Sequence, residues 1–348
     1  MPAVTAILQA NLPGWARDEG FLASSLLDRR WADVDPPSLV AVEEGKVVGF
    51  MGAQARRLVL DDRELLGVCA SQLAVNPEHR GGAAGALLMR RLLSGPQDLT
   101  WVDSATDLVT RMWRAFGGEV DLARAVDWML VLRPLRWTAG IAAGLARERK
   151  IRRRLAPVAA LPFQAAGRRL ATRAFPEPEI SVTGGDATAA EIAEALPEIN
   201  RGIRLRVGYE AEDLEHQLGR IRVAAGEVDH RLVHDGDQTV GWYAYLPRRR
   251  TASRVLHLAA LDRRVDAVLY ELITHARASG ASALSGRVEP HLAQPVRDRI
   301  AALGFGLQPL RHSRNPELET VLASSASLLT ELDSVDSSWW YQAGPADA

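Results

Sequence analysis

The chain has 348 residues, and a length well above about 150 predicts two domains rather than one. Apolar residues make up 47% of the chain and charged residues 24%, a globular composition that excludes a disordered protein. The 42 basic and 43 acidic side chains leave a net charge of -1, so no nucleic-acid partner is predicted. One cysteine excludes an intramolecular disulfide and a cysteine zinc cluster, and the sequence predicts no metal site. The absence of a long apolar run and of a signal-like start predicts no membrane span and a cytoplasmic location.

The chain up to Pro134 alternates between helix and strand patterns. Apolar side chains at helical spacing predict a first helix, and the prolines after Asp35 end it. Two β-branched runs around an acidic glycine turn predict a hairpin, with a third strand after the reversal at Asp61-Asp62. The predicted elements are helix 15–31, strands 38–42, 47–52 and 65–75, helix 85–93, strand 99–102, helix 108–116 and strand 127–132. They form one α/β unit with an antiparallel start.

The segment 138–175 is helical in composition and strongly basic. Between Arg147 and Arg173 it carries nine Lys or Arg against the single acid Glu148. A solvated helical linker between two domains explains this pattern. The alternative is a surface for anionic lipid, nucleic acid or a ligand phosphate.

The second half repeats the order of the first. The turn Asp235-Gly236-Asp237 lies between two apolar runs, as Glu44-Gly45 does in the first half. Two copies of one unit are therefore predicted. The predicted elements are helices 188–196 (ended by Pro197) and 211–223, strands 230–234, 239–243 and 254–261, helix 265–278, strand 283–288, helix 294–303, and a tail with helix 318–332 and aromatic residues 339–341.

One loop carries a clear chemical signal. After the strand that ends at Val75, the run Arg80-Gly81-Gly82-Ala83-Ala84-Gly85-Ala86 leads directly into a helix. Small residues let successive backbone N–H groups converge, and the start of a helix adds partial positive charge, so the loop suits a phosphate or pyrophosphate. A Walker lysine and the GxGxxG order are both absent, which disfavours nucleotide hydrolysis and Rossmann binding. A tight turn that merely needs small residues is the structural alternative.

The run from Ser38 to Leu93 resembles the core of the GNAT superfamily of acetyl-CoA-dependent N-acyltransferases. That family carries a Gln/Arg-x-x-Gly-x-Gly/Ala signature between its fourth strand and third helix. Here Arg80 fills the first position and Gly85 the last, while Ala83 stands where the middle glycine is expected. The resemblance extends by topology over 1–135 and more weakly over 177–315. The lead-in Leu73-Ala74-Val75-Asn76-Pro77-Glu78-His79-Arg80-Gly81 matches closely.

The resemblance implies a fold and a co-substrate. It implies two α/β (α+β) domains, each a mixed and mainly antiparallel sheet flanked by helices. The expected boundaries are 1–136 for the domain with the loop, 137–176 for the linker, 177–315 for a degenerate second copy and 316–348 for the tail. The backbone of Leu73, Ala74 and Val75 is expected to pair with the pantetheine of acetyl-CoA and to polarise its thioester carbonyl. The amides of Gly81, Gly82, Ala83, Ala84, Gly85 and Ala86, after Arg80, are expected to bind the pyrophosphate.

The catalytic side chains are less typical of the family. Strand alternation predicts that Cys69, Ser71, Leu73 and Val75 share one face, and Cys69 stands where some members have a general-base glutamate. Trp113 occupies the usual place of the general-acid tyrosine, so either water protonates the leaving thiolate or this domain no longer catalyses. Asp103 ends the next strand and is a further candidate. The candidate catalytic residues are therefore Cys69, Ser71 and Asp103.

The second copy has no comparable loop, because Leu261-Asp262-Arg263-Arg264-Val265-Asp266 is short and contains no glycine. Its aspartates favour helix capping and repel phosphate. The leading hypothesis is an acetyltransferase that acts on the amine of a small molecule or peptide, with a monomer favoured. The alternatives are a pseudo-acetyltransferase that only binds CoA or a partner, and an enzyme that transfers a larger acyl or aminoacyl group.

Overall fold

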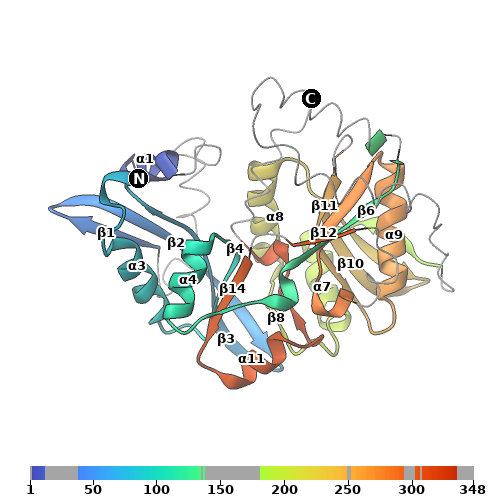
Figure 1. Ribbon diagram of the computed structural model, residues 1–348. Helices are drawn as coiled ribbons and strands as arrows, with labels where there is room; N and C mark the ends of the chain where they lie inside the picture. The colour runs from blue at the N-terminus through green and yellow to red at the C-terminus, as the bar shows by residue number, and fades with distance from the viewer. Residues whose placement is uncertain are drawn as a thin grey trace. The chain divides into compact units, whose positions relative to one another are not determined.

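The structure, a computed structural model, describes residues 2–11, 38–134, 136–137, 181–248, 252–293, 302–305 and 308–334. The chain divides into two compact units, each built around one mixed sheet (Figure 1). Unit 1 comprises residues 1–125, 203–226 and 306–348, and unit 2 comprises residues 126–202 and 227–305. These units differ from the contiguous ranges 1–136 and 177–315 predicted from the sequence, because each unit draws strands from both halves of the chain.

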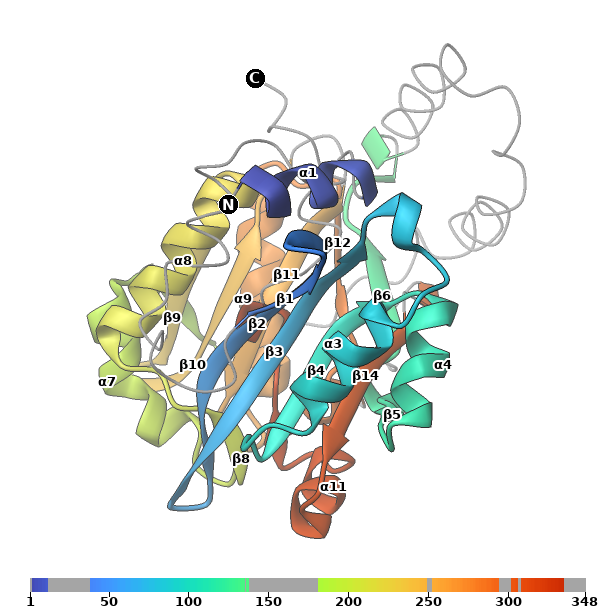
Figure 2. The same ribbon diagram turned by 90° about the vertical axis from the view of Figure 1, so that its left-hand side faces the viewer.

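Unit 1 contains an eight-stranded sheet in the order β15-β8-β2-β3-β4-β14-β5, with β1 paired to β2 (Figure 2). The long antiparallel hairpin β2–β3 forms its centre, and β4 adds to β3 in parallel. The strands are β1 (Leu39–Glu43), β2 (Lys46–Leu60), β3 (Arg63–Val75), β4 (Leu99–Ala105), β5 (Glu119–Val120), β8 (Leu205–Val207), β14 (Gln308–Ser313) and β15 (Ser327–Leu328). The helices are α1 (Pro2–Asn11), α3 (Ala84–Leu93), α4 (Asp107–Ala115), α8 (Ala211–Ala225) and α11 (Pro316–Leu322).

The two faces of the unit 1 sheet bury different side chains. Leu88 and Leu92 of α3 and Trp113 of α4 pack with Met51 and Val68 on one face. On the other face, apolar residues of β2, β3, β4 and β8 pack with side chains of α11; this cluster includes Leu58, Cys69, Trp101, Leu205, Leu318 and Leu322. Residues separated by more than 200 positions therefore share one core, which ties the end of the chain to its first half.

Unit 2 contains a seven-stranded sheet in the order β13-β6-β12-β11-β10-β9-β7. Helix α9 covers the face that presents Val233 and Tyr243, while α7 contacts β10. The strands are β6 (Val126–Val131), β7 (Thr183–Asp186), β9 (Asp229–Asp235), β10 (Gln238–Leu246), β11 (Ala252–Ala260), β12 (Ala283–Arg287) and β13 (Ala302–Phe305). The helices are α7 (Ala189–Ile199) and α9 (Val265–Ala278).

Each of the two sheets contains strands from both halves of the chain. In unit 1, β14 lies between β4 and β5, and in unit 2, β6 lies between β12 and β13. Side chains fix both inserted strands: the Trp113 indole N–H donates to the Arg311 carbonyl of β14 at 2.8 Å, and Arg254 pairs with Asp127 of β6 at 2.8 Å. Strands β6 and β14 therefore each complete the sheet of the unit that is otherwise built mainly from the other half of the chain.

The predicted mixed sheets flanked by helices are confirmed, and several boundaries change. The tail helix expected over 318–332 ends at Leu322 and is followed by β15 and a 3-10 turn. Pro197 lies inside α7 rather than ending it, and residues 302–303, expected at the end of a helix, begin β13. Helix α1 and strands β5, β7, β8, β14 and β15 were not expected. The predicted helix 15–31, the basic linker between 138 and 175, and the aromatic residues 339–341 lie outside the described residues.

Candidate functional site

Strands β3 and β4 run together only briefly before they separate. Their parallel pairing covers Gly67–Cys69 against Leu99–Trp101, although β3 continues to Val75 and β4 to Ala105. Beyond Cys69, the edge of β3 that faces β4 has no strand partner among the described residues. An unpaired strand edge offers backbone N–H and C=O groups to an extended ligand.

The direction of the Val75 backbone follows from the ladder between β2 and β3. The Asn76 N–H donates to the Val48 carbonyl at 2.8 Å, so the N–H and C=O of Val75 point away from β2. They therefore face the open edge, where the Asn11 side chain donates to the Val75 carbonyl at 3.1 Å. Asn11 also accepts a hydrogen bond from Arg80 at 2.8 Å and thus joins the end of α1 to the loop.

A bulge interrupts β3 within the predicted site. Ser71 pairs with Gly52 and Ala74 with Phe50, so Gln72 and Leu73 together oppose the single residue Met51. Gln72 has a φ of +47°, a value that is uncommon for residues other than glycine. Residues with such strained backbone conformations are found most often at functional sites. The sequence contains no signal for this bulge.

The bulge overturns the predicted alternation. Cys69 packs in the cluster with Trp101, and Ser71 follows on that same face. Leu73 instead packs toward α3, and the Val75 side chain lies beside Gly85 of α3. The expectation that all four side chains share one face is wrong, because the extra residue shifts the pattern by one position.

The loop before α3 has the backbone that a phosphate site needs. Gly81 has a φ of +87°, a conformation that favours glycine, whereas Ala83 has a φ of -80° and is unstrained. The first intrahelical bond runs from the Leu87 N–H to the Ala83 carbonyl, so the N–H groups from Ala83 to Ala86 precede the helical ladder. No side chain caps this helix start, and its first turn contains no acidic residue. The positive end of α3 is therefore available to an anion.

Gly85 keeps space open beside this helix start. A Cβ atom at residue 85 would lie 3.4 Å from Cγ2 of Val75 and 3.8 Å from Cε of Met112. A methyl group fits at these distances, but a longer side chain would extend between α3 and the end of β3. The small size of residue 85 thus leaves the start of α3 and the end of β3 without a side chain between them.

The three candidate catalytic residues lie on the neighbouring strands β3 and β4 of unit 1. Cys69 is fully buried in the apolar cluster, the setting of a cysteine with a packing role. Ser71 is buried and donates to Oε1 of Gln72 at 2.5 Å. Asp103 is half-buried and lies on β4 beyond the last residue paired with β3, where the register of β4 against β14 shifts.

Trp113 packs in the core of unit 1 and holds β14 by a hydrogen bond. Its side chain is 0% exposed, and its indole N–H is used by the Arg311 carbonyl. A Cβ atom on Gly118 would lie 2.1 Å from the Trp113 ring, so glycine at residue 118 is required for this packing. Trp113 therefore fixes the inserted strand β14 and has no polar atom left for a reacting group.

Polar residues that sequence patterns did not reveal flank the candidates. Arg56 donates to Oε1 of Gln54 at 3.2 Å and to Oε1 of Gln217 at 3.0 Å, while Arg220 donates to Oε1 of Gln54 at 2.6 Å. Two guanidinium groups thus give positive charge to the face that carries Cys69. Gln54 and Arg220 are far apart in the sequence, so no local motif could have identified them.

The corresponding loop in unit 2 lacks these features. Arg263 takes a φ of +62°, and Arg264 at the helix start pairs with Asp235 at 3.0 Å. Asp266 lies in the first turn of α9. An acidic first turn and bulky basic side chains make this loop unlike the loop of unit 1 and unsuited to a closely bound pyrophosphate.

Because of the buried His257, we expect the free energy of unfolding of unit 2 to fall in acid. His257 is 5% exposed and stacks on Trp242 at 4.1 Å; burial, and secondarily the charge of His291, lower its pKa to about 3. The unfolded chain takes up a proton near pH 6.5 and the folded unit does not, so this stability is complete above pH 6.5 and is lost as pH falls toward 3. A loss of about 2 kcal/mol is expected between pH 7 and pH 5.

Urea denaturation of the wild type and of His257→Phe at both pH values measures this contribution. Phenylalanine keeps a ring against Trp242 but does not titrate. Burial raises the pKa of Asp333 in unit 1 to about 6, an effect of opposite sign, but it is common to both proteins and cancels in the comparison. Equal pH dependence in the two proteins would contradict the assignment to His257.

Comparisons with known proteins agree on the fold. The model of the acetyltransferase (GNAT) family matches residues 2–100. A GCN5-related N-acetyltransferase from Anabaena variabilis ATCC 29413 superposes with a TM-score of 0.56 at 11% identity, over 90% of this chain and 70% of that one. A conserved protein of unknown function from Enterococcus faecalis V583, described as a probable N-acyltransferase, gives a TM-score of 0.52 at 11% identity, over 79% of this chain and 61% of that one.

The chain thus spans less than two thirds of the Enterococcus protein. No curated protein matches the sequence significantly. Among the described residues, no cluster of His, Cys, Asp or Glu is arranged to hold a metal ion, and no helix is long and apolar enough to cross a membrane. Residues 2–100 match the GNAT acetyltransferase family, and the chain as a whole has the fold of GNAT N-acetyltransferases.

Proposed function

We propose that unit 1 binds acetyl-CoA and transfers its acetyl group to the amine of a small molecule or peptide. The observation that carries this proposal is the separation of β3 from β4 directly before an uncapped helix start. The edge of β3 from Leu73 to Val75 would hold the pantetheine. The amides of Gly81 and of Ala83 to Ala86 would hold the pyrophosphate, since the Gly82 N–H donates to the His79 carbonyl at 3.3 Å. Acetyl-CoA supplies an activated thioester carbonyl.

The described residues fit this co-substrate. The helix start has free donors, no cap and no acidic first turn, as a pyrophosphate requires. Gly85 leaves room along the path to the open edge. Arg80 adds a positive charge beside the loop, since its hydrogen-bond partner Asn11 is neutral.

The chemistry proposed is direct attack. The amine nitrogen forms a bond to the carbonyl carbon while the carbon–sulfur bond breaks; the amine loses a proton and the thiolate gains one. Trp113 and Cys69 are buried in packing roles, so water is proposed to protonate the thiolate. Asp103 is the proposed acceptor of the amine proton, because it is the carboxylate among the three candidate residues.

Calorimetric titration of acetyl-CoA and free CoA into the full chain tests the proposal. Micromolar binding of both is expected, followed by turnover when amines are screened with CoA release as the readout. Binding without turnover of any amine would favour a pseudo-acetyltransferase, and tighter binding of longer acyl-CoA esters would favour a larger acyl donor. No binding of either ligand would overturn the proposal.

A further inference from the structure

Gln72 combines a strained backbone with a buried polar group that has no partner. The side chain is 5% exposed, and its Nε2 atom meets no hydrogen-bond acceptor among the described residues. A buried amide donor is almost always satisfied in a folded protein, by protein, by water or by a ligand. Its presence in a bulge with positive φ is a second, independent sign of function.

Neighbouring residues hold the Gln72 carboxamide in one orientation. The Ser71 hydroxyl donates to Oε1 of Gln72 at 2.5 Å, and the carboxamide oxygen is the atom of the Gln72 side chain that can accept from an O–H group. This bond holds Oε1 on Ser71 and leaves the buried Nε2 as the donor without a partner among the described residues. A Cβ atom on Gly52 would lie 2.7 Å from Ser71 Oγ and 2.9 Å from Gln72 Oε1, so glycine at residue 52 makes room for the pair.

The position of the bulge indicates what the donor meets. The bulge lies on β3 beyond the last residue paired with β4 and three positions before Val75, whose backbone faces the open edge. A ligand with its phosphates at the start of α3 and its chain along this edge reaches Gln72 with its far end. In acetyl-CoA that end carries the thioester, and a neutral amide donor suits a neutral carbonyl oxygen.

We infer that Nε2 of Gln72 donates a hydrogen bond to the thioester carbonyl oxygen of acetyl-CoA, with Ser71 and Gly52 as positioning residues. This inference rests on the proposed function. During attack by the amine, the carbonyl electron pair moves onto this oxygen, the carbon–nitrogen bond forms, and the pair returns as the thiolate leaves. A fixed donor stabilises the negative charge on oxygen at that stage.

Titration of acetyl-CoA and of free CoA into the wild type, Gln72→Met and Ser71→Ala tests the inference. Methionine has similar length and the same strain but no donor. We expect acetyl-CoA to bind about tenfold more weakly to Gln72→Met, as for one lost neutral hydrogen bond, with CoA binding unchanged. Ser71→Ala is expected to give a smaller loss in the same direction. Gln97→Met is the matched control, since Gln97 hydrogen-bonds to Leu92 and Thr100 away from the bulge.

Infrared spectroscopy of acetyl-CoA with a ¹³C-labelled carbonyl gives a readout that a merely structural role of Gln72 does not change. The bound carbonyl stretch is expected at lower frequency in the wild type and to rise in Gln72→Met. An unchanged frequency and an unchanged acetyl-CoA to CoA ratio, with CoA still bound, would overturn this inference alone. No CoA binding in the wild type would overturn the proposed function and this inference together.

Discussion

Replacing Gly85 with glutamate is expected to weaken CoA binding by at least ~100-fold, or about 2.7 kcal/mol, without unfolding unit 1. The new side chain would extend from a Cβ atom 3.4 Å from Val75 toward the end of β3. Its carboxylate would also bring negative charge to the first turn of α3, where the pyrophosphate is proposed to lie. Calorimetric titration of CoA, together with the urea midpoint of the variant, measures both effects.

Two further substitutions at residue 85 separate bulk from charge. Gly85→Gln has the size of glutamate without its charge, and Gly85→Ala adds only a methyl group at ordinary contact distance. We expect alanine to retain CoA binding and to stabilise α3, since glycine in a helix costs about 1 kcal/mol relative to alanine. Wild-type affinity in the glutamate variant would show that the loop is only a turn.

The sequence predicted the loop and the strand before it because both depend on local residue types. Glycine and alanine from Gly81 to Ala86 indicate a close backbone approach, and a strand that ends at Asn76-Pro77 is a local signal as well. Ala83 stands where the family signature has a glycine, and its negative φ shows that alanine is accommodated there without backbone strain. Local motifs of this kind can be predicted from the sequence because the backbone conformation they indicate does not depend on contacts with distant parts of the chain.

The bulge at Gln72 could not be predicted in the same way. Period-two alternation predicts a strand but not an inserted residue, and Gln72 is an ordinary residue type at that place. The partner that creates the bulge is the single residue Met51 on the neighbouring strand. The cluster of Gln54, Arg56 and Arg220 depends on long-range contacts for the same reason.

The sheet to which a strand belongs could not be predicted from the sequence pattern either. β6 was predicted as the last strand of the first domain, and it pairs with β12 and β13 of unit 2. β14 was not predicted at all, yet it completes the unit 1 sheet beside β4. A strand pattern shows which face is apolar, but not which of two similar sheets receives the strand.

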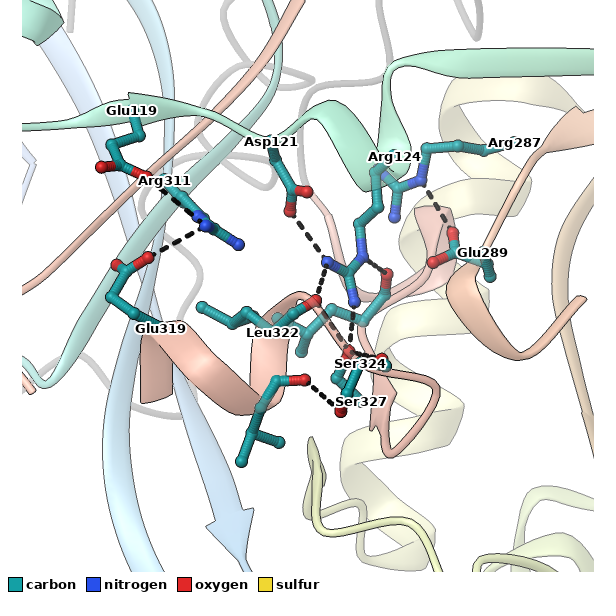
Figure 3. A network of polar contacts seen from close by, with 12 residues as sticks. Glu119, Asp121, Arg124, Arg287, Glu289, Arg311, Glu319, Leu322, Ser324 and Ser327 are labelled. Atoms are coloured by element: carbon teal, nitrogen blue, oxygen red, sulfur yellow. Dashed lines mark hydrogen bonds and ion pairs between the residues drawn. The ribbon is translucent and has the colours of Figure 1, made fainter. Parts of the chain in front are cut away.

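Replacing Arg124 with methionine is expected to lower the free energy of unfolding of unit 1 by about 3–5 kcal/mol. Arg124 is 4% exposed and pairs with the buried Asp121 at 2.8 Å (Figure 3). It also donates to Ser327 Oγ at 2.7 Å and to the carbonyl groups of Leu322 and Leu329 at 3.2 Å. Methionine would leave a buried carboxylate without its counter-ion and several acceptors without donors.

Three comparisons isolate this contribution in urea denaturation. Ser327→Ala removes one acceptor and is expected to cost about 1 kcal/mol. Arg63→Met breaks an ion pair with Glu317 whose side chains are 56% and 39% exposed, and is expected to cost less than about 1 kcal/mol. Adding Asp121→Asn to Arg124→Met should recover part of the loss, because the unpaired buried charge is then absent.

Arg124→Met is also expected to affect the proposed acetyl-CoA site, through the segment 316–334. Arg124 is the penultimate residue of the first segment of unit 1. Three of its acceptors, Ser327 Oγ and the carbonyl groups of Leu322 and Leu329, lie in 316–334, directly after β14. Release of that segment would free the β4 edge that β14 covers, and β4 is one side of the opening in which acetyl-CoA is proposed to bind. Arg124→Met should therefore weaken CoA binding near its unfolding midpoint, while Arg63→Met should not. A loss below about 1 kcal/mol in Arg124→Met would mean that packing of α11 alone holds the tail in place.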